Sequence, residues 1–374
     1  MVLFLHNRYR TTGGEERVVE DLMRLVRERM NEPAELLARD SGRLGSATAA
    51  FGLLRGGLAP GEVADAVRAG GARVVHAHNL HPALGWRALA AARQAGARVV
   101  LHLHQYRLVC AVGVCFTEGA ECTRCHGRNT LPGVRRNCRG SRSEALVYGA
   151  ALALWQRRLV EQADAVIVPS RFALERLAEL GAAIPTELVH ILAPPVPLQL
   201  DPGPRREAGR YALVVSRLAP EKGVDIAIDA CRIAGIPLVI AGDGPERGAL
   251  GARAAGLDVR FAGRVDEREL AALRAGAALA LAPSRSGETF GMAAAEAMAA
   301  GLPVAGSRIG ALSELLESGA LAEPGDADGL AGAAARLMGD AEAGERARLR
   351  VAQLCSPDLI ASRLSAIYDG RDPA

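Results

Sequence analysis

Short hydrophobic runs alternate along the whole chain with longer stretches that are rich in Ala, Leu and Arg. Several of these runs are apolar at every position, a pattern typical of strands that helices cover on both faces of a parallel sheet. Strands that alternate with helices in this way predict βαβ units and the α/β fold class. The expected strands are residues 2–5, 73–76, 98–103, 165–168, 187–192, 211–216, 237–241, 259–262, 278–282 and 303–306.

A proline-rich stretch divides this pattern into two halves. Five prolines lie between Pro194 and Pro204, a density that neither a helix nor a central strand accommodates. We therefore expect two doubly wound, Rossmann-like domains, residues 1–195 and 196–356, that face a central ligand cleft at the carboxyl ends of their sheets. Residues 357–374 are expected to form a helix that packs back toward the first domain.

Length and composition limit the classes of protein to which the chain can belong. A chain of 374 residues fits two domains of ordinary size. Its net charge of +3 comes from 45 Lys and Arg scattered among 42 Asp and Glu, which argues against nucleic acid as a partner. The hydrophobic residues Met1 to Leu5 are too few for a signal peptide, and no apolar run reaches the length of a membrane span, about 18 residues. We expect a soluble cytoplasmic protein and leave open a peripheral contact with the inner face of the membrane.

The stretch from Ser216 to Gly223 combines two cations with a turn directly after an expected strand. Arg217 and Lys222 lie five residues apart there, and Gly223 allows the chain to turn. Such a pair can bind a diphosphate, with the guanidinium as a two-pronged donor and the ammonium as a point charge. The alternative is two solvated charges on an ordinary loop.

Two further segments follow expected strands. Gly242 begins the turn Gly-Asp-Gly-Pro at the sheet edge where α/β proteins bind ligands, although a plain turn explains it equally well. After Pro283, a polar loop leads into a helix that is expected to begin near Phe290. The N-terminus of such a helix is a ready site for phosphate.

Two glutamates flank the start of this helix. Glu288 precedes it and Glu296 lies within it, about 12 Å away if the whole segment were helical. This spacing is on the scale of a diphosphate with a sugar on each side. A glutamate in an Ala-rich helix is usually solvated, but Glu296 has small apolar neighbours on both sides, where an unpaired charge is costly to bury. We therefore expect Glu296 to have a ligand as its partner.

The segments SRLAPEKG, AGDGPE and ETFGMAAAE, in this order and spacing, resemble glycosyltransferase family 4, which has the GT-B architecture. The resemblance spans residues 211–325. It implies that Arg217 and Lys222 hold the diphosphate of a nucleotide sugar, that Glu288 binds the donor sugar and that Glu296 binds the ribose. It implies further donor contacts at Ser216, Gly242, Val265, Phe290, Gly291 and Met292.

This family relationship implies a retaining hexosyltransferase that moves a sugar from a UDP- or GDP-sugar to a hydroxyl acceptor. The acceptor would be a glycan, a lipid-linked sugar or a natural product, and no cofactor beyond the nucleotide sugar is needed for catalysis. One alternative is another GT-B enzyme that acts on sugar nucleotides, such as an epimerase or a phosphorylase-like enzyme. A second alternative is a catalytically silent protein that binds sugar nucleotides.

The first half carries two candidate features. Gly13 and Gly14 precede an expected helix and let the backbone approach a ligand, and the resemblance assigns them to the family's first donor loop. His104 follows the expected strand 98–103 at the place of the family's acceptor-side catalytic histidine, with Gln105 where relatives often carry Asp. His102 is expected to point to the other face of the strand and to be a packed residue.

Five of the seven cysteines lie in residues 110–138, an irregular segment with few apolar residues. Cys122 and Cys125 have the spacing of a zinc knuckle, and Cys110 and Cys138 complete a tetrahedral ligand set. A structural zinc ion would order this segment. Reduced thiols and disulfides are the alternatives, and disulfides are disfavoured in the cytosol. A branch of the family has a similar insert, which implies a structural role.

Overall fold

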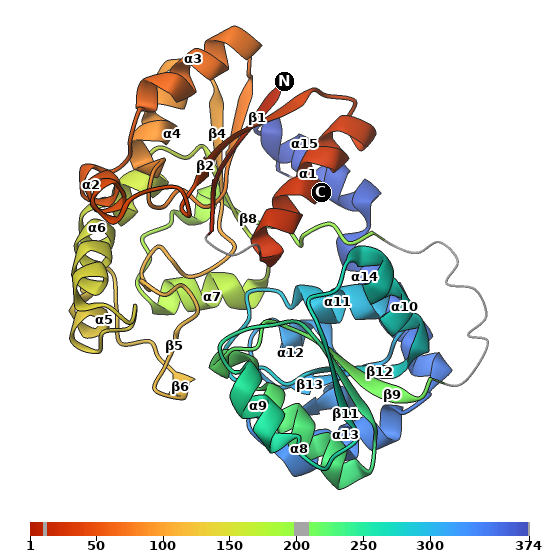
Figure 1. Ribbon diagram of the computed structural model, residues 1–374. Helices are drawn as coiled ribbons and strands as arrows, with labels where there is room; N and C mark the ends of the chain where they lie inside the picture. Colours follow the sequence, from red (N-terminus) through yellow and green to blue (C-terminus); the bar gives the residue numbers. More distant parts are fainter. Residues whose placement is uncertain (10–12, 198–208, 373–374) are drawn as a thin grey trace. The chain divides into compact units, whose positions relative to one another are not determined.

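The computed structural model of the chain describes residues 1–9, 13–197 and 209–372, which form two compact units (Figure 1). The first unit comprises Met1–Cys115, Cys122–Pro195 and Pro357–Ala374. The second unit comprises Phe116–Glu121 and Val196–Ser356. Residues 198–204 of the proline-rich stretch lie outside the described part of the chain.

Six parallel strands form the sheet of the first unit, in the order β2-β1-β3-β4-β7-β8. The chain moves outward in one direction from β1 to β2 and in the other direction from β3 to β8. The switch point of this doubly wound sheet therefore lies between β1 and β3, where ligands of such sheets bind. The strands are β1 (Val2–Arg8), β2 (Ala34–Asp40), β3 (Val74–Ala77), β4 (Arg98–His102), β7 (Ala165–Val168) and β8 (Val189–Ile191).

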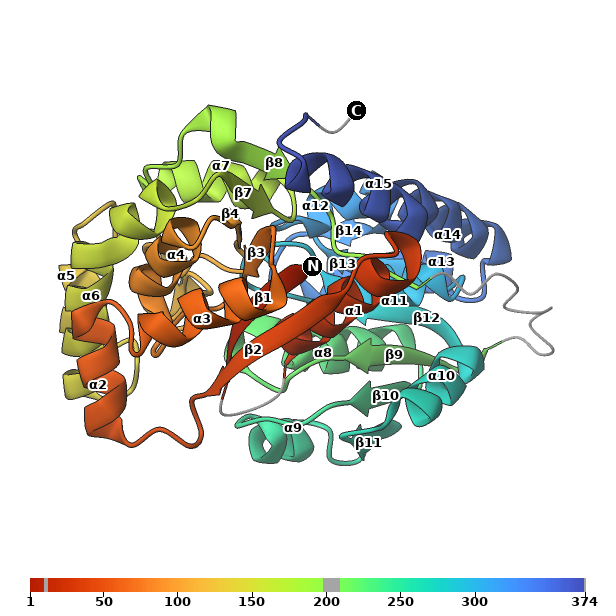
Figure 2. The ribbon, with the colours of Figure 1, turned by 90° about the horizontal axis from the view of Figure 1, so that it is seen from above.

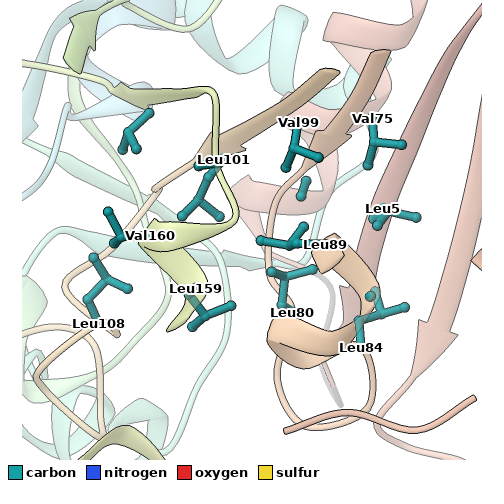
Figure 3. Packing of buried hydrophobic residues seen from close by; sticks show 14 of the residues in the cluster. Leu5, Val75, Leu80, Leu84, Leu89, Val99, Leu101, Leu108, Leu159 and Val160 are labelled. Atoms are coloured by element: carbon teal, nitrogen blue, oxygen red, sulfur yellow. The ribbon is translucent and has the colours of Figure 1, made fainter. Parts of the chain in front are cut away.

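Helices cover both faces of this sheet. The face that carries Leu5, Val75 and Val99 packs against α3 (Pro60–Gly70), α4 (Gly85–Gln94), α6 (Arg142–Glu161) and α7 (Arg171–Glu179), and Figure 3 shows Leu89 and Leu159 of this layer against the strand side chains. The opposite face is covered by α1 (Gly14–Arg29) and α15 (Pro357–Tyr368), which contact each other (Figure 2). Two further helices, α2 (Ser46–Arg55) and α5 (Leu131–Arg135), contact α6.

The second unit also has a sheet of six parallel strands, in the order β11-β10-β9-β12-β13-β14. Its switch point lies between β9 and β12, because β10 and β11 extend one edge and β13 and β14 extend the other. The strands are β9 (Tyr211–Val215), β10 (Leu238–Ala241), β11 (Val259–Gly263), β12 (Ala277–Ala282), β13 (Val304–Ser307) and β14 (Leu321–Ala322). The helices are α8 (Val224–Ala234), α9 (Arg247–Arg253), α10 (Glu267–Gly276), α11 (Met292–Ala299), α12 (Leu312–Leu315), α13 (Ala327–Leu337) and α14 (Ala341–Cys355).

The predicted α/β fold class is confirmed, and all ten expected strands coincide with strands of the two sheets. Two sheet strands were not expected. β2 is an edge strand in which only the first residue is buried, and its charged residues Glu35, Arg39 and Asp40 interrupt the apolar run that marks the other strands. β14 has only two residues. A short hairpin of β5 (Phe116–Thr117) and β6 (Ala120–Glu121), within the cysteine-rich segment, was not expected either.

Candidate functional site

The predicted donor-binding residues gather at the carboxyl edge of the sheet in the second unit. The loop that holds Arg217 and Lys222 follows β9, and the loop that holds Glu288 follows β12. Because β9 and β12 are hydrogen-bonded neighbours, these two loops begin side by side at the sheet edge and then run to opposite sides of the switch point. Lys222 Nζ donates a hydrogen bond to Glu288 Oε1 at 2.9 Å. A cation and a carboxylate that are 66 residues apart in the sequence thus lie together.

Glu288 is a half-buried carboxylate with two donors on the same oxygen. Oε1 accepts hydrogen bonds from Lys222 and from the hydroxyl of Ser284, and the side chain is 20% exposed. Burial acts to raise the pKa of Glu288, but the Lys222 charge and the hydrogen bonds from Ser284 and Lys222 hold that pKa below its ordinary value. Glu288 is therefore ionised at neutral pH, and an ionised carboxylate accepts hydrogen bonds from hydroxyl groups.

Arg217 lies beside this pair with its guanidinium in water. Its side chain is 57% exposed and forms an ion pair with Glu221, which is buried. Glu221 belongs to the same turn, and its carboxylate accepts a hydrogen bond from Nη2 of the Arg217 guanidinium. The remaining guanidinium donors form a planar fork that suits phosphate oxygens.

The helix α11 begins next to Glu288 without a side-chain cap. Gly291 precedes its first residue, Met292, with a φ of +94°, a left-handed conformation that favours glycine. A Cβ atom on Gly291 would lie 2.8 Å from Cδ2 of Leu312, and the Oε2 atom of Glu288 is 3.9 Å from the same position. Phe290 is buried directly before this turn. The first N–H groups of an uncapped helix favour an anion such as phosphate.

Glu296, inside α11, already has a protein partner. Its carboxylate forms an ion pair with Arg274 of α10, and the two side chains are only 14% and 16% exposed. Arg274 thus compensates the buried charge of Glu296, so this charge by itself does not require a ligand. Sequence reasoning missed Arg274, since no local signal links α10 with α11. Ribose binding by Glu296 stays a prediction.

The remaining predicted donor positions line the same edge. Ser216 N–H donates to the carbonyl of Ala241 at 3.0 Å, so the loops after β9 and β10 are adjacent. Gly242 has a φ of +137°, and a Cβ atom there would lie 1.9 Å from the carbonyl oxygen of Ser216. Gly242 N–H in turn donates to the carbonyl of Gly263 at 2.7 Å, two residues before Val265. A glycine at position 242 is thus a steric requirement of this edge.

In the first unit, Gly13 and Gly14 lie at the start of α1, as predicted. A carboxylate of the protein itself, however, accepts hydrogen bonds there. Glu16 accepts hydrogen bonds from Gly13 N–H at 2.8 Å and from Tyr9 N–H at 3.0 Å. Among the described residues, no atom outside α1 and the adjoining residues lies within 4 Å of the Cβ position of Gly14. Residues 10–12 of this predicted loop lie outside the described part of the chain.

His104 borders a cavity of about 40 Å³ at the carboxyl edge of the first unit's sheet. His78 Nδ1 and His104 Nε2 lie 2.7 Å apart, so one ring nitrogen donates a hydrogen bond to the other. Burial lowers the pKa of the His104 imidazole, while the charge of Glu15 acts in the opposite direction. The net effect keeps His104 neutral at neutral pH, with its ring oriented by His78.

Residues that sequence reasoning did not single out also line this cavity, among them Tyr9, Glu15 and Arg107. Gln105 stands where relatives often carry Asp. Its amide donates to the Glu15 carboxylate at 2.9 Å and to the Tyr9 hydroxyl. One sequence signal could have identified Tyr9 and Glu15 as residues of this cavity, namely their position on either side of Gly13.

The expected orientation of His102 was wrong. Residues two apart on a strand share a face, and the rings of His102 and His104 stack with centroids 4.2 Å apart. His102 is nevertheless a packed residue, as expected, with 2% exposure.

The cysteine-rich segment gives no support to the predicted zinc ligands Cys110, Cys122, Cys125 and Cys138. Among the described residues, the group whose ligand atoms all lie within 4.8 Å of one another consists of His76, His78 and His102. Cys110 is instead hydrogen-bonded with Cys115, which lowers the pKa of the Cys110 thiol to about 6. Burial raises the pKa of the Cys125 thiol to about 11, and the neighbouring thiols of Cys110, Cys138 and Cys122 act in the same direction. Zinc binding by these four cysteines stays a prediction.

Two known protein families match the chain. The family described as "Glycosyl transferase 4-like domain" matches residues 2–195, and the family described as "Glycosyl transferases group 1" matches residues 209–340. The second match contains the Lys222–Glu288 pair and α11.

Curated relatives resemble part of the chain. A GDP-mannose-dependent alpha-(1-6)-phosphatidylinositol dimannoside mannosyltransferase of Mycobacterium tuberculosis is 39% identical over 182 residues, which are 43% of this chain and 45% of the relative. A phosphatidyl-myo-inositol mannosyltransferase of Mycobacterium leprae is 30% identical over 237 residues, 60% of this chain and 62% of the relative. The chain thus spans about half the length of the first relative and less than two thirds of the second.

Solved structures share the fold along the whole chain. HepE of Anabaena in complex with UDP superposes with a TM-score of 0.64 at 19% identity and covers 98% of this chain and 99% of its own. A glycosyltransferase from Rickettsia africae superposes with a TM-score of 0.69 at 15% identity and covers 98% of this chain and 97% of its own. At these identities the likeness shows the fold.

The half-buried histidine His81, at the same cavity, predicts a pH dependence of stability. Burial lowers its pKa to about 3, and the charges of Arg107 and Arg139 act in the same direction. An unfolded histidine has a pKa of about 6.5. Below that pH the unfolded state binds a proton that the folded state does not, so His81 costs stability as the pH falls from about 6.5 toward about 3, by up to about 1.4 kcal/mol per pH unit.

We expect His81→Asn to lose less stability than the parent protein on acidification from pH 7 to pH 5, because the variant lacks this titration. Urea denaturation at a series of pH values measures the difference. His126→Asn is the control, since His126 is exposed and lies outside the cavity lining. Parallel pH profiles for the parent and His81→Asn would contradict the prediction.

Proposed function

The chain belongs to the glycosyl transferase 4-like family, and we propose that it transfers a sugar from a nucleotide diphosphate to a hydroxyl acceptor. The observation that carries the proposal is the Lys222–Glu288 ion pair beside the start of α11 at the switch point of the second unit's sheet. A cation and helix N–H groups favour a phosphate at this place, and the ionised carboxylate next to them favours sugar hydroxyls.

In this proposal the second unit stabilises the leaving diphosphate. Arg217, Lys222 and the first N–H groups of α11 offset the negative charge that develops as the bond between the sugar's anomeric carbon and the phosphate oxygen breaks. The acceptor oxygen forms the new bond on the same face, and its proton passes to the departing phosphate oxygen. Configuration is then retained without a protein nucleophile. Glu288 holds the donor sugar, and His104 is assigned to the acceptor side.

The donor is proposed to be a GDP- or UDP-hexose. The curated relative from Mycobacterium tuberculosis is named as dependent on GDP-mannose, and the solved Anabaena structure contains UDP. The second unit presents the backbone after β11 and the carboxylate of Glu296 for the nucleoside. Ribose hydroxyls can donate to Glu296 while Arg274 continues to neutralise its charge.

We propose a lipid-linked acceptor at the cytoplasmic face of a membrane, because both curated relatives are named as enzymes that act on phosphatidylinositol compounds. No helix within the described residues is long and apolar enough to cross a membrane. Contact with lipid would then be peripheral.

A surface of the first unit fits such a contact. Phe51 and Leu54 of α2 are 54% and 44% exposed, and Leu146 and Leu154 of α6 are 59% and 47% exposed. The two helices are joined by a hydrogen bond from Trp155 Nε1 to the carbonyl of Leu54 at 3.1 Å. Exposed apolar side chains on adjacent helices are typical of proteins that insert into the interface of a bilayer.

Arginines accompany these apolar residues. Arg55 lies over the ring of Phe51 at 5.5 Å, and Arg157 and Arg158 are exposed on α6. Arg158 pairs with Glu161, so Arg55 and Arg157 contribute most of the positive charge. Each such arginine near an anionic bilayer adds about 1 kcal/mol of attraction. We therefore propose an anionic phospholipid surface as the partner of α2 and α6.

We expect Glu288→Gln to reduce sugar transfer by about 100-fold or more, because the variant loses the charge that orients the donor in the transition state. Release of nucleoside diphosphate, measured over UDP- and GDP-hexoses with lipid-linked acceptors, reports transfer. Glu345→Gln is the matched control, since Glu345 also pairs with a cation, Arg348, but on the surface of α14. Transfer by Glu288→Gln at the parent rate would overturn the assignment. Nucleotide binding without release of diphosphate by the parent would point to a silent binding protein.

Glu296→Gln should raise the KM for the donor about 10-fold with little change in kcat, because a charge-assisted hydrogen bond to ribose is worth about 1.5–3 kcal/mol in both the ground state and the transition state. Arg274→Gln breaks the same ion pair but keeps the carboxylate, so its KM for the donor should change less. Steady-state kinetics with varied donor measure both. An equal rise in KM in the two variants would show that the ion pair matters instead of ribose binding.

The variant Phe51→Ser/Leu54→Ser should lose binding to vesicles that contain phosphatidylglycerol, and Arg55→Gln/Arg157→Gln should weaken it by about 1 kcal/mol for each arginine. Cosedimentation with phosphatidylglycerol and with pure phosphatidylcholine vesicles measures this binding. Ile233→Ser/Leu349→Ser removes two exposed apolar residues of the second unit and should bind as the parent does. Unchanged binding of Phe51→Ser/Leu54→Ser would rule out α2 as the contact.

A further inference from the structure

Three buried histidines of the first unit converge on one point. His76 and His78 lie two residues apart along β3 and its continuation, and His102 ends the neighbouring strand β4. One ring nitrogen of each lies within 4.8 Å of a ring nitrogen of both others. Their exposed fractions are 0%, 4% and 2%, so bulk water does not compete for these nitrogens. We call His76, His78 and His102 the histidine group.

The spacing within the histidine group matches metal coordination by imidazoles. His76 Nε2 and His102 Nδ1 lie 3.2 Å apart. Two nitrogens that bind one tetrahedral zinc ion at about 2.1 Å lie about 3.4 Å from each other. A small movement of the two rings would therefore let a metal ion replace the hydrogen bond between them.

Two members of the group also have the outer partners that metal-bound histidines need. The hydroxyl oxygen of Tyr368 lies 2.7 Å from His76 Nδ1, and His104 Nε2 lies 2.7 Å from His78 Nδ1. A partner on the second ring nitrogen fixes the orientation of a ligating histidine and raises its basicity. The contact from Tyr368 comes from α15, so the group also connects β3 with that helix.

Two ring nitrogens of the group lack partners. His78 Nε2 and His102 Nε2 are buried and have no hydrogen-bond partner within the part of the chain that the structure describes. Buried polar atoms in folded proteins are nearly always satisfied, so an orphaned nitrogen calls for an explanation. A metal ion bound by His78 Nε2 would supply a partner for this one of the two nitrogens.

The cavity beside His104 leaves room for a further ligand. His78 and His102 belong to its lining, and its volume is about 40 Å³. One water molecule needs about 10–15 Å³ of such space. A water molecule in the cavity can therefore complete a tetrahedral set with three imidazole nitrogens.

We propose that His76, His78 and His102 bind one Zn²⁺ ion, with water as the fourth ligand. Imidazole nitrogens prefer Zn²⁺ and its transition-metal neighbours to Mg²⁺ and Ca²⁺. The ion holds β3, β4 and α15 together through the Tyr368 contact, and it orients His104 through His78. Its role is structural, because metal binding to folded ligands adds to the stability of the unit that holds them.

The test uses the full-length protein, purified without a histidine tag, stripped with a chelator and titrated with Co²⁺ and then Zn²⁺. We expect one equivalent of Co²⁺ to bind with the visible absorption of a nitrogen-ligated tetrahedral ion and without a thiolate-to-cobalt band in the near ultraviolet. Zn²⁺ should displace the Co²⁺ and raise the melting temperature. Failure of the parent protein to bind one equivalent would overturn the proposal.

Matched variants identify the ligands. His102→Ala should lose the cobalt spectrum, whereas His190→Ala, at a histidine outside the group, should keep it. Cys122→Ser/Cys125→Ser should also keep it. A thiolate band in the parent that disappears in this cysteine variant would overturn the proposal and place the metal ion in the cysteine-rich segment.

Tyr368→Phe keeps the ring volume and removes only the outer partner of His76. Loss of such a partner weakens metal binding about 10- to 100-fold, so we expect a rise of this size in the Zn²⁺ dissociation constant measured by competition with a chelator. Because Tyr368→Phe keeps all three ligands, it tests metal binding by the histidine group even if His102→Ala does not fold. An unchanged dissociation constant would contradict ligation through His76.

Discussion

The contact between Lys222 and Glu288 at the switch point of the second unit's sheet is the interaction on which the proposed donor site depends. At the switch point of a doubly wound parallel sheet, the loops that follow two adjacent strands run in opposite directions. The backbone therefore leaves a gap between these loops, and side chains from both loops meet in it. Lys222 and Glu288 are 28% and 20% exposed, and charges at that depth need partners. The same holds for Glu221 with Arg217 and for Glu296 with Arg274. A diphosphate sugar would thus exchange partners with existing ion pairs, and the side chains stay positioned in its absence.

The sheet of the first unit also has a switch point, but the side chains at its carboxyl edge are of a different chemical kind. Its switch point lies between β1 and β3, and imidazoles take the place of the ion pairs. Histidine rings stack at the carboxyl ends of β3 and β4, with centroids 5.3 Å apart for His76 and His102 and 5.0 Å apart for His78 and His104. His76 and His102 are offset by two residues, because His76 lies beside Val100 in the strand register. Neutral rings avoid the cost of burying charge while they retain donors and acceptors.

The sequence predicts the fold class and the position of the second unit's site better than it predicts the individual contacts within the sites. Apolar strands followed by polar loops identify the fold class and the second unit's site edge, because burial on both faces leaves a strong local pattern. β2 escapes this pattern because its edge position tolerates charges. The partner of Glu296 is a contact between two helices, α10 and α11, that no spacing rule encodes. The histidine group was hidden by an error of strand periodicity at His102, because that ring was expected on the face opposite His104.

The contact between Tyr368 and His76 has a consequence for the order in which the protein is made. Tyr368 belongs to the first unit, yet 292 residues separate it from His76, and residues 196–356 of the second unit intervene in the sequence. A ribosome therefore releases the β3 and β4 strands long before the helix that covers their histidines exists. Until α15 emerges, this face of the nascent sheet exposes Phe4, His76 and His102 to solvent or to chaperones. Closing so long a loop is slow, so completion of the first unit is expected to be a late, post-translational event.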